Sequence, residues 1–382
     1  MAEIFLNTGF SKDFRTESPS RLPQDFHQKL HGYRPTPFLS LHHLATKFHL
    51  DEIMLKDEGS RLGLPAFKIL GASWAVFQAL RQHLKVAVNE IVSLQDIGKF
   101  VGERHSLKLV CATDGNHGRA VARVGRMLGI PSRIHVPAGI TEQRMEAIEA
   151  EGGIVVMGGT YDESLVRAKN DAASGGLLIQ DTAWEGFEQI PQWTVDGYST
   201  LFWEIEDELE KQNKQKPTHV VVQIGVGSLA AAVVRHYRRK ELPQPPVIIG
   251  VEPKGSDCVL ASVKAGRMVR LQGEQHSIMA GLNCGTASTI SLPILQKGVR
   301  CFLAIEDERA KEAVRSFAGE GVISGETGAA GLAGLIELCS QDNETARREL
   351  GLDANSRVLL ISTEGITDKE LYNEIVGKGT QR

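Results

Sequence analysis

Lys68 is the residue whose surroundings first suggest chemistry. A loop rich in glycine and proline, Gly59 to Pro65, leads into an apolar helix predicted from Ile69 to Leu80, and Lys68 stands at the junction. A lysine with apolar neighbours on both sides can be buried as a neutral amine, and a neutral amine forms a Schiff base with an aldehyde. The alternative for a single lysine is a surface position without chemical role.

A glycine-rich loop, Gly225-Val226-Gly227-Ser228, follows a predicted buried strand and precedes a predicted helix. Backbone N–H groups converge in such a loop and the helix N-terminus adds positive potential, so a phosphate is well accommodated. Ala230 occupies the position of the third glycine of a dinucleotide fingerprint, so the pattern does not favour a nicotinamide dehydrogenase. A tight turn without a ligand is the alternative.

Ser362 and Thr363 end the last predicted strand of the chain. Sheets of α/β proteins place ligands at the carboxyl ends of their strands, although strand-end capping explains the two hydroxyls as well. Glu326 opens a predicted helix beside Gly325 and Gly328, where it either pairs with the helix dipole or contacts a cofactor.

These stretches resemble the motifs of a known family. Phe67 to Ala72 is similar to the cofactor-lysine motif of the pyridoxal phosphate enzymes of the tryptophan synthase β fold type, which include threonine and serine dehydratases and cysteine synthase. Within this family the chain is most similar to the diaminopropionate ammonia-lyases. Further matching stretches lie in the expected order over most of the chain: Ala112 to Gly118, Asp181 to Gly186, Gly225 to Ser228 and Ser362 to Gly365.

The resemblance implies a set of cofactor contacts. Pyridoxal 5'-phosphate would be bound by Lys68 through its aldehyde, by Gly225 to Ser228 through its phosphate, and by Asn116 through its hydroxyl. The pyridine nitrogen would meet the hydroxyl of Ser362 or of Thr363, and the sequence leaves both open. A hydroxyl does not force that nitrogen to be protonated, which suits elimination better than a long-lived carbanion.

The loop from Thr113 to His117 departs from the dehydratase pattern. The corresponding dehydratase loop reads Ser-Ala-Gly-Asn-His and binds the substrate carboxylate, a role that the resemblance gives to Thr113, Asp114, Gly115 and His117. Asp114 stands where the dehydratases have alanine. A carboxylate there is unfavourable unless a cation offsets it, and the second ammonium group of 2,3-diaminopropionate supplies one. An exposed aspartate in a turn is the alternative.

Asp181 and two cysteines complete the candidates. By resemblance Asp181 is a second carboxylate facing the amino groups of the substrate, and as a local feature it is equally well a helix N-cap. His117 also has a purely structural interpretation, within a turn. Cys258 and Cys284 could form a disulfide only if their Cα atoms lie within about 7 Å, and a reducing cytoplasm argues against a permanent bridge.

The elements that must position these residues alternate between strands and helices. A chain of 382 residues predicts two domains. By resemblance, residues 88–183 form a small domain inserted into a large cofactor-binding domain of residues 1–87 and 184–382. The expected fold is α/β, pyridoxal phosphate fold type II, with two doubly wound domains and the cofactor in the cleft between them.

The individual predictions follow apolar runs and turn residues. Residues 1–50 are expected to be largely irregular, with a helix at 41–48. Residues 253–300 are expected to contain mixed local structure with polar turns. A helix at 187–212 is expected to be broken at Pro191. The remaining strands are predicted at 53–56, 107–112, 132–136, 154–157, 177–180, 218–224, 247–251, 301–305 and 357–361, and the remaining helices at 69–84, 119–128, 141–151, 162–173, 229–239, 307–320 and 329–339.

Composition narrows the class of protein. The net charge of -4 gives no basic field for nucleic acid or an anionic membrane, and no apolar run is long enough to span a bilayer. The five cysteines are scattered without a C-x-x-C pair, so no metal site is indicated. The first ten residues lack the pattern of a signal peptide, and a cytoplasmic enzyme is expected. The family resemblance implies that the protein forms a homodimer.

The predicted function is the α,β-elimination of 2,3-diaminopropionate, of one or both isomers, to pyruvate and ammonia. Lys68 would remove the Cα proton of one isomer, and Asp114 that of the other. The nearest alternative is a serine or threonine dehydratase of the same fold, from which Asp114 distinguishes the chain. An alternative of another class is a non-catalytic cofactor-binding or interaction protein, against which Lys68, Asn116 and the glycine loop argue.

Overall fold

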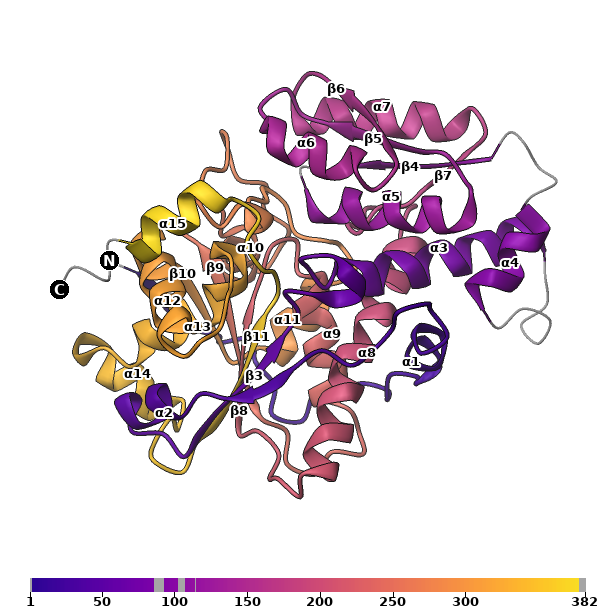
Figure 1. Ribbon diagram of the computed structural model, residues 1–382. Helices are drawn as coiled ribbons and strands as arrows, with labels where there is room; N and C mark the ends of the chain where they lie inside the picture. Colours follow the sequence, from indigo (N-terminus) through magenta and orange to yellow (C-terminus); the bar gives the residue numbers. More distant parts are fainter. Residues whose placement is uncertain (1, 86–92, 102–106, 114, 378–382) are drawn as a thin grey trace. The chain divides into compact units, whose positions relative to one another are not determined.

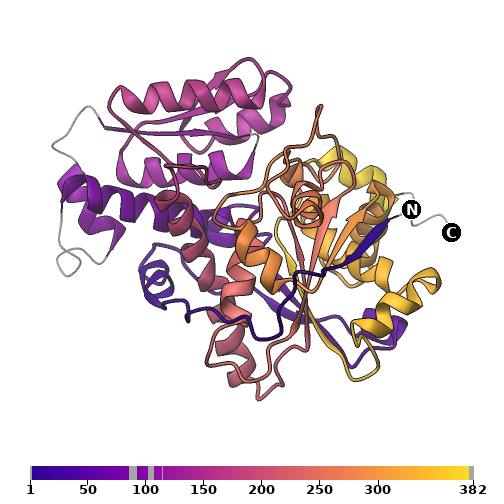
Figure 2. The same cartoon turned by 180° about the vertical axis from the view of Figure 1, so that it is seen from behind.

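The structure is a computed structural model that describes residues 2–85, 93–101, 107–113 and 115–377. It divides into two compact units. Unit 1 comprises Met1–Pro19, Pro35–Arg61 and Leu201–Arg382, and unit 2 comprises Ser20–Arg34 and Leu62–Thr200. Figure 1 labels most of their helices and strands, and Figure 2 shows the same chain from behind.

Unit 1 is built on a sheet of seven described strands in the order β1-β10-β9-β8-β11-β3-β2. The five inner strands are parallel, whereas the edge strands β1 and β2 run antiparallel to their neighbours. Parallel strands end at one edge of the sheet, so loops far apart in sequence meet there. The strands are β1 (Glu3–Leu6), β2 (Phe38–Ser40), β3 (Glu52–Asp57), β8 (His219–Gln223), β9 (Val247–Pro253), β10 (Cys301–Ile305) and β11 (Arg357–Ser362).

Helix α13 (Glu326–Leu338) lies along one face of this sheet and contacts β8, β9, β10 and β11. It can approach closely because small residues face the strands: a Cβ at Gly331 would lie 3.2 Å from the Val221 carbonyl oxygen, and one at Gly334 would collide with Val251. The other helices of this unit are α2 (His42–Phe48), α9 (Ser228–Tyr237), α10 (Cys258–Ala265), α11 (Leu292–Gly298), α12 (Asp307–Gly319), α14 (Glu344–Glu349) and α15 (Lys369–Gly377).

Unit 2 has a sheet of four parallel described strands in the order β6-β5-β4-β7. Its core joins α3 and α5 to the strands, and Phe26 of α1 packs against Trp74 and Phe77 of α3 in an aromatic group. Its elements are α1 (Leu22–His27), α3 (Lys68–Leu84), α4 (Leu94–Val101), β4 (Lys108–Ala112), α5 (Asn116–Leu128), β5 (Ser132–Val136), α6 (Glu142–Glu149), β6 (Gly153–Met157), α7 (Tyr161–Ala173) and β7 (Gly176–Leu178), with α8 (Gln189–Lys211) continuing into unit 1.

The α/β class and the parallel strands are confirmed, with some local corrections. The predicted break at Pro191 is wrong: α8 starts at Gln189, so the proline lies in the first turn, where its missing N–H breaks no helical hydrogen bond. Strand β1 and helix α1 lie in the stretch expected to be largely irregular. The domain limits stay a prediction; unit 2 differs from the predicted small domain in including α3, which packs against α5.

A buried ionic cluster lies within unit 1 beside three of the points where the chain passes between units. The Arg61 guanidinium donates to both oxygens of Glu58, at 2.6 and 2.8 Å, and to both of Glu204, at 2.7 Å each. Lys56 lies 2.7 Å from Glu204 and donates to the Thr36 carbonyl. Burial opposes ionisation of Glu204, but Arg61 and Lys56 hold its pKa at about 2.

The cluster therefore fastens the chain just after residue 35, just before residue 62 and just after residue 200. Its side chains are at most 1 % exposed, and its two positive and two negative charges balance. A buried charge is tolerated only when it is paired and hydrogen-bonded. The segment that leads to Lys68 starts from this anchor.

We expect Arg61→Met to lower the free energy of unfolding by about 3 kcal/mol or more, because Glu58 would keep a buried charge without its partner. Denaturant unfolding monitored by circular dichroism measures the change. Lys254→Met, which breaks a half-exposed ion pair with Glu306 at 2.5 Å, is the matched control and should leave stability unchanged. Equal effects of the two substitutions would contradict the anchoring role.

Candidate active site

Lys68 is the first residue of α3, so its side chain leaves the helix at its N-terminal end. The ammonium group donates a 2.7 Å hydrogen bond to Oδ2 of Asp181, and the two side chains are 23 % and 13 % exposed. Burial opposes ionisation of Asp181, but the Lys68 charge outweighs it and holds the pKa of the carboxyl well below its usual range. The amine and the carboxylate, 113 residues apart, thus form one charged pair.

Asp181 reaches Lys68 because β7 ends early. The predicted strand at 177–180 is paired only to Leu178, after which Ile179 donates its N–H to the Val110 carbonyl oxygen at 2.7 Å. The Gln180 side chain then replaces backbone pairing: its amide contacts the Ala112 N–H at 3.1 Å and the Ala112 carbonyl at 2.8 Å. With the ladder completed by a side chain, the backbone can turn away from the sheet at Asp181.

His117 holds the same segment from α5. Its Nε2 lies 2.9 Å from the Ile179 carbonyl oxygen, which can only accept, so Nε2 carries the proton. Burial lowers the pKa of His117, and the nearby Asp181 charge offsets only part of that shift, so the ring is neutral. Its Nδ1, 3.9 Å from Asp181, has no hydrogen-bond partner among the described residues. The direct contacts of His117 are therefore structural.

The predicted carboxylate loop leads into α5. Thr113 is buried and its hydroxyl accepts the N–H of Gly115, while Asn116 is the first residue of the helix. Gly118 allows close packing, since a Cβ there would meet Ile134 at 2.7 Å. The N–H groups of a first helical turn have no partner within the helix, which favours an anion at this end. Asp114 lies outside the described residues.

Tyr198 of α8 is a neighbour of Lys68 that the sequence did not identify. Its ring lies 4.7 Å from the Phe67 ring, centroid to centroid, and is completely buried. A Cβ at Gly71 would lie 2.6 Å from Cε1 of the tyrosine, so the glycine one turn after Lys68 makes room for the ring. Gly197 allows the same approach from α8, because its Cβ would meet the Leu70 carbonyl at 2.5 Å. A tyrosine within a helical pattern gives no sequence signal of this placement.

In unit 1 the glycine loop lies at the carboxyl end of β8. Gly227 has a φ of 100°, in the left-handed region, and α9 begins at Ser228. A Cβ at Gly225 would lie 3.2 Å from the Cys284 sulfur, and one at Gly227 would lie 2.9 Å from Leu295. Both glycines are thus required by conformation or space, and the loop leaves the first N–H groups of α9 directed away from its own helix.

The surroundings of this loop fit a phosphate group. The segment that follows the 280–285 turn donates the Ser288 N–H to the Val226 carbonyl at 2.8 Å. The hydroxyls of Thr289 and Ser291 in this segment are buried and have no hydrogen-bond partner among the described residues. Ser291 borders Gly227 directly, its Cβ 3.1 Å from where a Gly227 Cβ would lie. Buried hydroxyls without partners are costly, and an anion at the helix start would satisfy such donors.

Ser362 and Thr363 follow at the end of β11, the neighbour of β8. The Gln223 amide at the end of β8 donates to the Thr363 hydroxyl at 2.9 Å and to the Ile361 carbonyl at 2.9 Å, whereas the Ser362 hydroxyl pairs with Ser324 at 2.9 Å. The 362–365 turn packs against the start of α13, where a Cβ at Gly328 would lie 2.5 Å from the Ser324 hydroxyl. The structure therefore brings these two candidates and the glycine loop to one edge of one sheet.

The remaining candidates have simpler environments. Glu326 is the first residue of α13 and is buried. Cys258 and Cys284 are both free thiols, and both border Gly225, since the Cys258 sulfur lies 3.9 Å from its carbonyl oxygen.

The described residues contain no cluster of His, Cys, Asp or Glu that could hold a metal ion. No described helix combines the length and apolarity needed to cross a bilayer.

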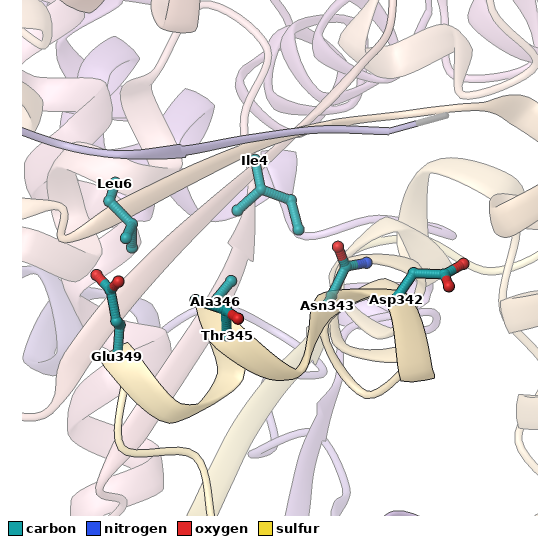
Figure 3. A pocket seen from close by; sticks show the side chains of 7 residues that line it. All are labelled: Ile4, Leu6, Asp342, Asn343, Thr345, Ala346 and Glu349. Carbon is teal, nitrogen blue, oxygen red and sulfur yellow. The ribbon is translucent and has the colours of Figure 1, made fainter.

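A separate pocket, shown in Figure 3, lies between β1 and α14 of unit 1. Ile4 and Leu6 form its apolar side, and Asp342 and Glu349 are its two carboxylates; Asn343, Thr345 and Ala346 complete the lining. None of the candidate site residues lines it, and its side chains include neither a base paired with a nucleophile nor a cation. It adds nothing to the chemistry described above.

Comparison with known proteins agrees with this arrangement. The family model of the pyridoxal-phosphate dependent enzymes matches residues 29–364. The diaminopropionate ammonia-lyase of Escherichia coli K12 is 36 % identical over 374 residues, which cover 95 % of this chain and 92 % of that protein.

Two solved structures are similar over nearly the whole chain. The holo diaminopropionate ammonia-lyase of E. coli superposes with a TM-score of 0.91 at 34 % identity, covering 99 % of this chain and 97 % of that one. The same enzyme in complex with an aminoacrylate-PLP azomethine reaction intermediate gives a TM-score of 0.88 at 33 % identity, with the same coverage. The fold expected from the sequence is confirmed.

We expect the His117 ring to titrate below its usual pKa of about 6.5, because burial favours the neutral form. As pH falls below 6.5 the unfolded chain takes up this proton before the folded protein does, so His117 lowers stability in that window. NMR titration of the ring signals, with His117→Gln to assign the resonance, gives the midpoint. A midpoint at or above 6.5 would mean that the Asp181 charge dominates over burial.

Proposed function

We infer the function from the family: the chain belongs to the pyridoxal-phosphate dependent enzymes and, within them, to the diaminopropionate ammonia-lyases. It is a carbon–nitrogen lyase whose cofactor is pyridoxal 5'-phosphate, and its reaction is an α,β-elimination. The observation that carries the site assignment is the pairing of the Lys68 amine with Asp181 at the start of α3.

The substrate is 2,3-diaminopropionate, which with one water yields pyruvate and two ammonia. Its second ammonium group matches the carboxylates of this chain, since Asp181 is held ionised beside Lys68 and Asp114 belongs to the loop before α5. A serine or threonine dehydratase, the alternative from the sequence, has no need of carboxylates there. The near-complete coverage by an ammonia-lyase relative also argues against a non-catalytic binding protein.

The proposed cofactor contacts come from the glycine loop and from single polar side chains elsewhere in the chain. Gly225, Val226, Gly227 and Ser228 receive the cofactor phosphate at the N-terminus of α9. When bound, pyridoxal phosphate forms a Schiff base with an amine and draws electron density away from the substrate Cα. Of the two hydroxyls, either Ser362 or Thr363 meets the pyridine nitrogen, and Asn116 meets the cofactor hydroxyl.

Residues of unit 2 bind the substrate carboxylate and remove the Cα proton. The N–H groups at the start of α5, His117 among them through its backbone, receive the substrate carboxylate together with Thr113 and Gly115. Lys68 takes the Cα proton of one isomer as general base. Asp181 accepts an N–H from the Lys68 amine and so keeps it in place. Asp114 takes the Cα proton of the opposite isomer, with Asp181 as the reserve.

We also propose that the protein works in the cytoplasm and as a homodimer, the assembly that the family resemblance in its sequence implies. Sedimentation velocity of the purified protein at micromolar concentration separates dimer from monomer.

Lys68 should carry the cofactor. Borohydride reduction of the yellow holoenzyme followed by peptide mapping is expected to place the label on Lys68, and Lys68→Ala should abolish turnover because both the cofactor attachment and the base are lost. Lys169, another unit 2 lysine, which lies over the Trp184 ring at 3.8 Å, provides the control Lys169→Ala with normal label and turnover. A label on any other lysine would overturn the assignment.

Asp114→Asn should separate the two isomers. The amide keeps the shape of the side chain but cannot accept a proton, so turnover of D-diaminopropionate should fall by roughly 100-fold or more, with the L-isomer less affected. Pyruvate release on each isomer measures this. Equal loss on both isomers would make Asp114 a binding residue, and no loss on either would favour the dehydratase alternative.

A further inference from the structure

The Tyr198 hydroxyl has no hydrogen-bond partner among the described residues, although its ring packs against the first turn of α3, next to Lys68. It is buried and makes no hydrogen bond to any described residue, although its ring is fixed between Phe67 and Gly71. Leaving a hydroxyl buried and unpaired costs about 1–3 kcal/mol. A phenylalanine would fill the same space without that cost, so packing alone does not explain the oxygen.

Among the charged side chains around the Tyr198 hydroxyl, the Lys68 amine acts on it most strongly. Gly71 is three residues after Lys68, so the two lie on the same face of α3, and the Cζ atom that carries the Tyr198 hydroxyl lies 2.8 Å from where a Gly71 Cβ would be. Burial raises the pKa of Tyr198, and the Lys68 charge counteracts part of that rise. The phenol is therefore neutral, and it lies near enough to the Lys68 amine for the two groups to interact.

We propose that Tyr198 is a positioning residue whose hydroxyl oxygen accepts an N–H of Lys68 when that amine acts as a base. A neutral amine has one bond to Cε, two N–H donors and one lone pair. If Asp181 accepts one N–H and Tyr198 the other, the direction of the lone pair is fixed. The amine then cannot rotate its lone pair away from the proton it must remove. This inference rests on the proposed function of Lys68.

The other titratable groups that the structure describes near the amine do not offer this contact. Among the described residues, the titratable groups that face the Lys68–Asp181 pair are His117 on α5, Tyr198 on α8 and, beyond Asp181, Cys111 on β4. The His117 proton is engaged with Ile179, and burial raises the pKa of Cys111, which keeps it a neutral thiol. Of these titratable groups, Tyr198 is therefore the one that offers a second oxygen acceptor in addition to Asp181.

Tyr198→Phe removes the oxygen and keeps the ring. We expect kcat for diaminopropionate to fall roughly tenfold, the worth of one hydrogen bond to an amine, with KM and the cofactor dissociation constant little changed. Because an oxygen acceptor favours the ammonium form, the acidic limb of the kcat/KM profile should move to lower pH. The absorbance of the Lys68–cofactor Schiff base against pH, which needs no turnover, should shift its midpoint as well.

Tyr237→Phe is the matched control. Tyr237 is also buried, its hydroxyl also lacks a partner among the described residues, and burial raises its pKa, but it lies on α9 near Glu206 and Arg239. Loss of its hydroxyl should leave kcat, the pH profile and the Schiff-base midpoint unchanged. Its orphan hydroxyl shows that an unpaired oxygen alone does not define a role, so the comparison isolates proximity to Lys68.

A graded variant separates hydrogen bonding from packing. Replacing Tyr198 by 3-fluorotyrosine keeps the ring and the hydroxyl but weakens the oxygen as an acceptor, so kcat and both pH midpoints should fall between tyrosine and phenylalanine. An unchanged profile in Tyr198→Phe, or a loss of stability and cofactor affinity without any pH shift, would overturn the proposal. Failure of the proposed function is seen separately, as borohydride label on another lysine in the unsubstituted protein.

Discussion

The ion pair between Lys68 and Asp181 is the interaction on which unit 2 depends. A half-buried amine and a buried carboxylate each lose hydration, and they are stable only because each compensates the other. Every neighbouring element contributes to that geometry: β7 ends early, the Gln180 side chain completes the ladder, and His117 holds Ile179. The Lys68–Asp181 pair can therefore form because β7 stops pairing with β4 at Leu178.

Buried polar groups are paired in the ionic cluster but partly unpaired around the candidate site residues. In the cluster of Arg61, Glu58 and Glu204, each charged group is met by an oppositely charged partner, and such a network rigidifies the chain. Around the candidate site residues, three polar atoms have no hydrogen-bond partner within the described part of the chain: Nδ1 of His117, the Tyr198 hydroxyl and the Ser291 hydroxyl. Satisfied networks stabilise the structure, whereas an unsatisfied donor or acceptor that lies beside a candidate residue is available to a ligand or a moving proton.

Glycine decides how closely the backbone elements of unit 1 can approach. Gly227 adopts a left-handed conformation that starts α9, and Gly328 lets the turn after β11 lie against α13. Both positions are at the carboxyl edge of the sheet, where five parallel strands bring their loops together. The high glycine content of the chain therefore has a specific structural use there rather than a general one.

The sequence by itself determined the class of fold, Lys68, the glycine loop and the order of the motifs, because these depend on local patterns: apolar runs, turn glycines and the spacing of strand and helix. It could not place Asp181 against Lys68 across 113 residues, find Tyr198, or join Gln223 to Thr363. Those contacts depend on where strands stop and which way side chains point. Only the packed tertiary structure decides that, since a polar residue in a helix or strand carries no local signal of its distant partner.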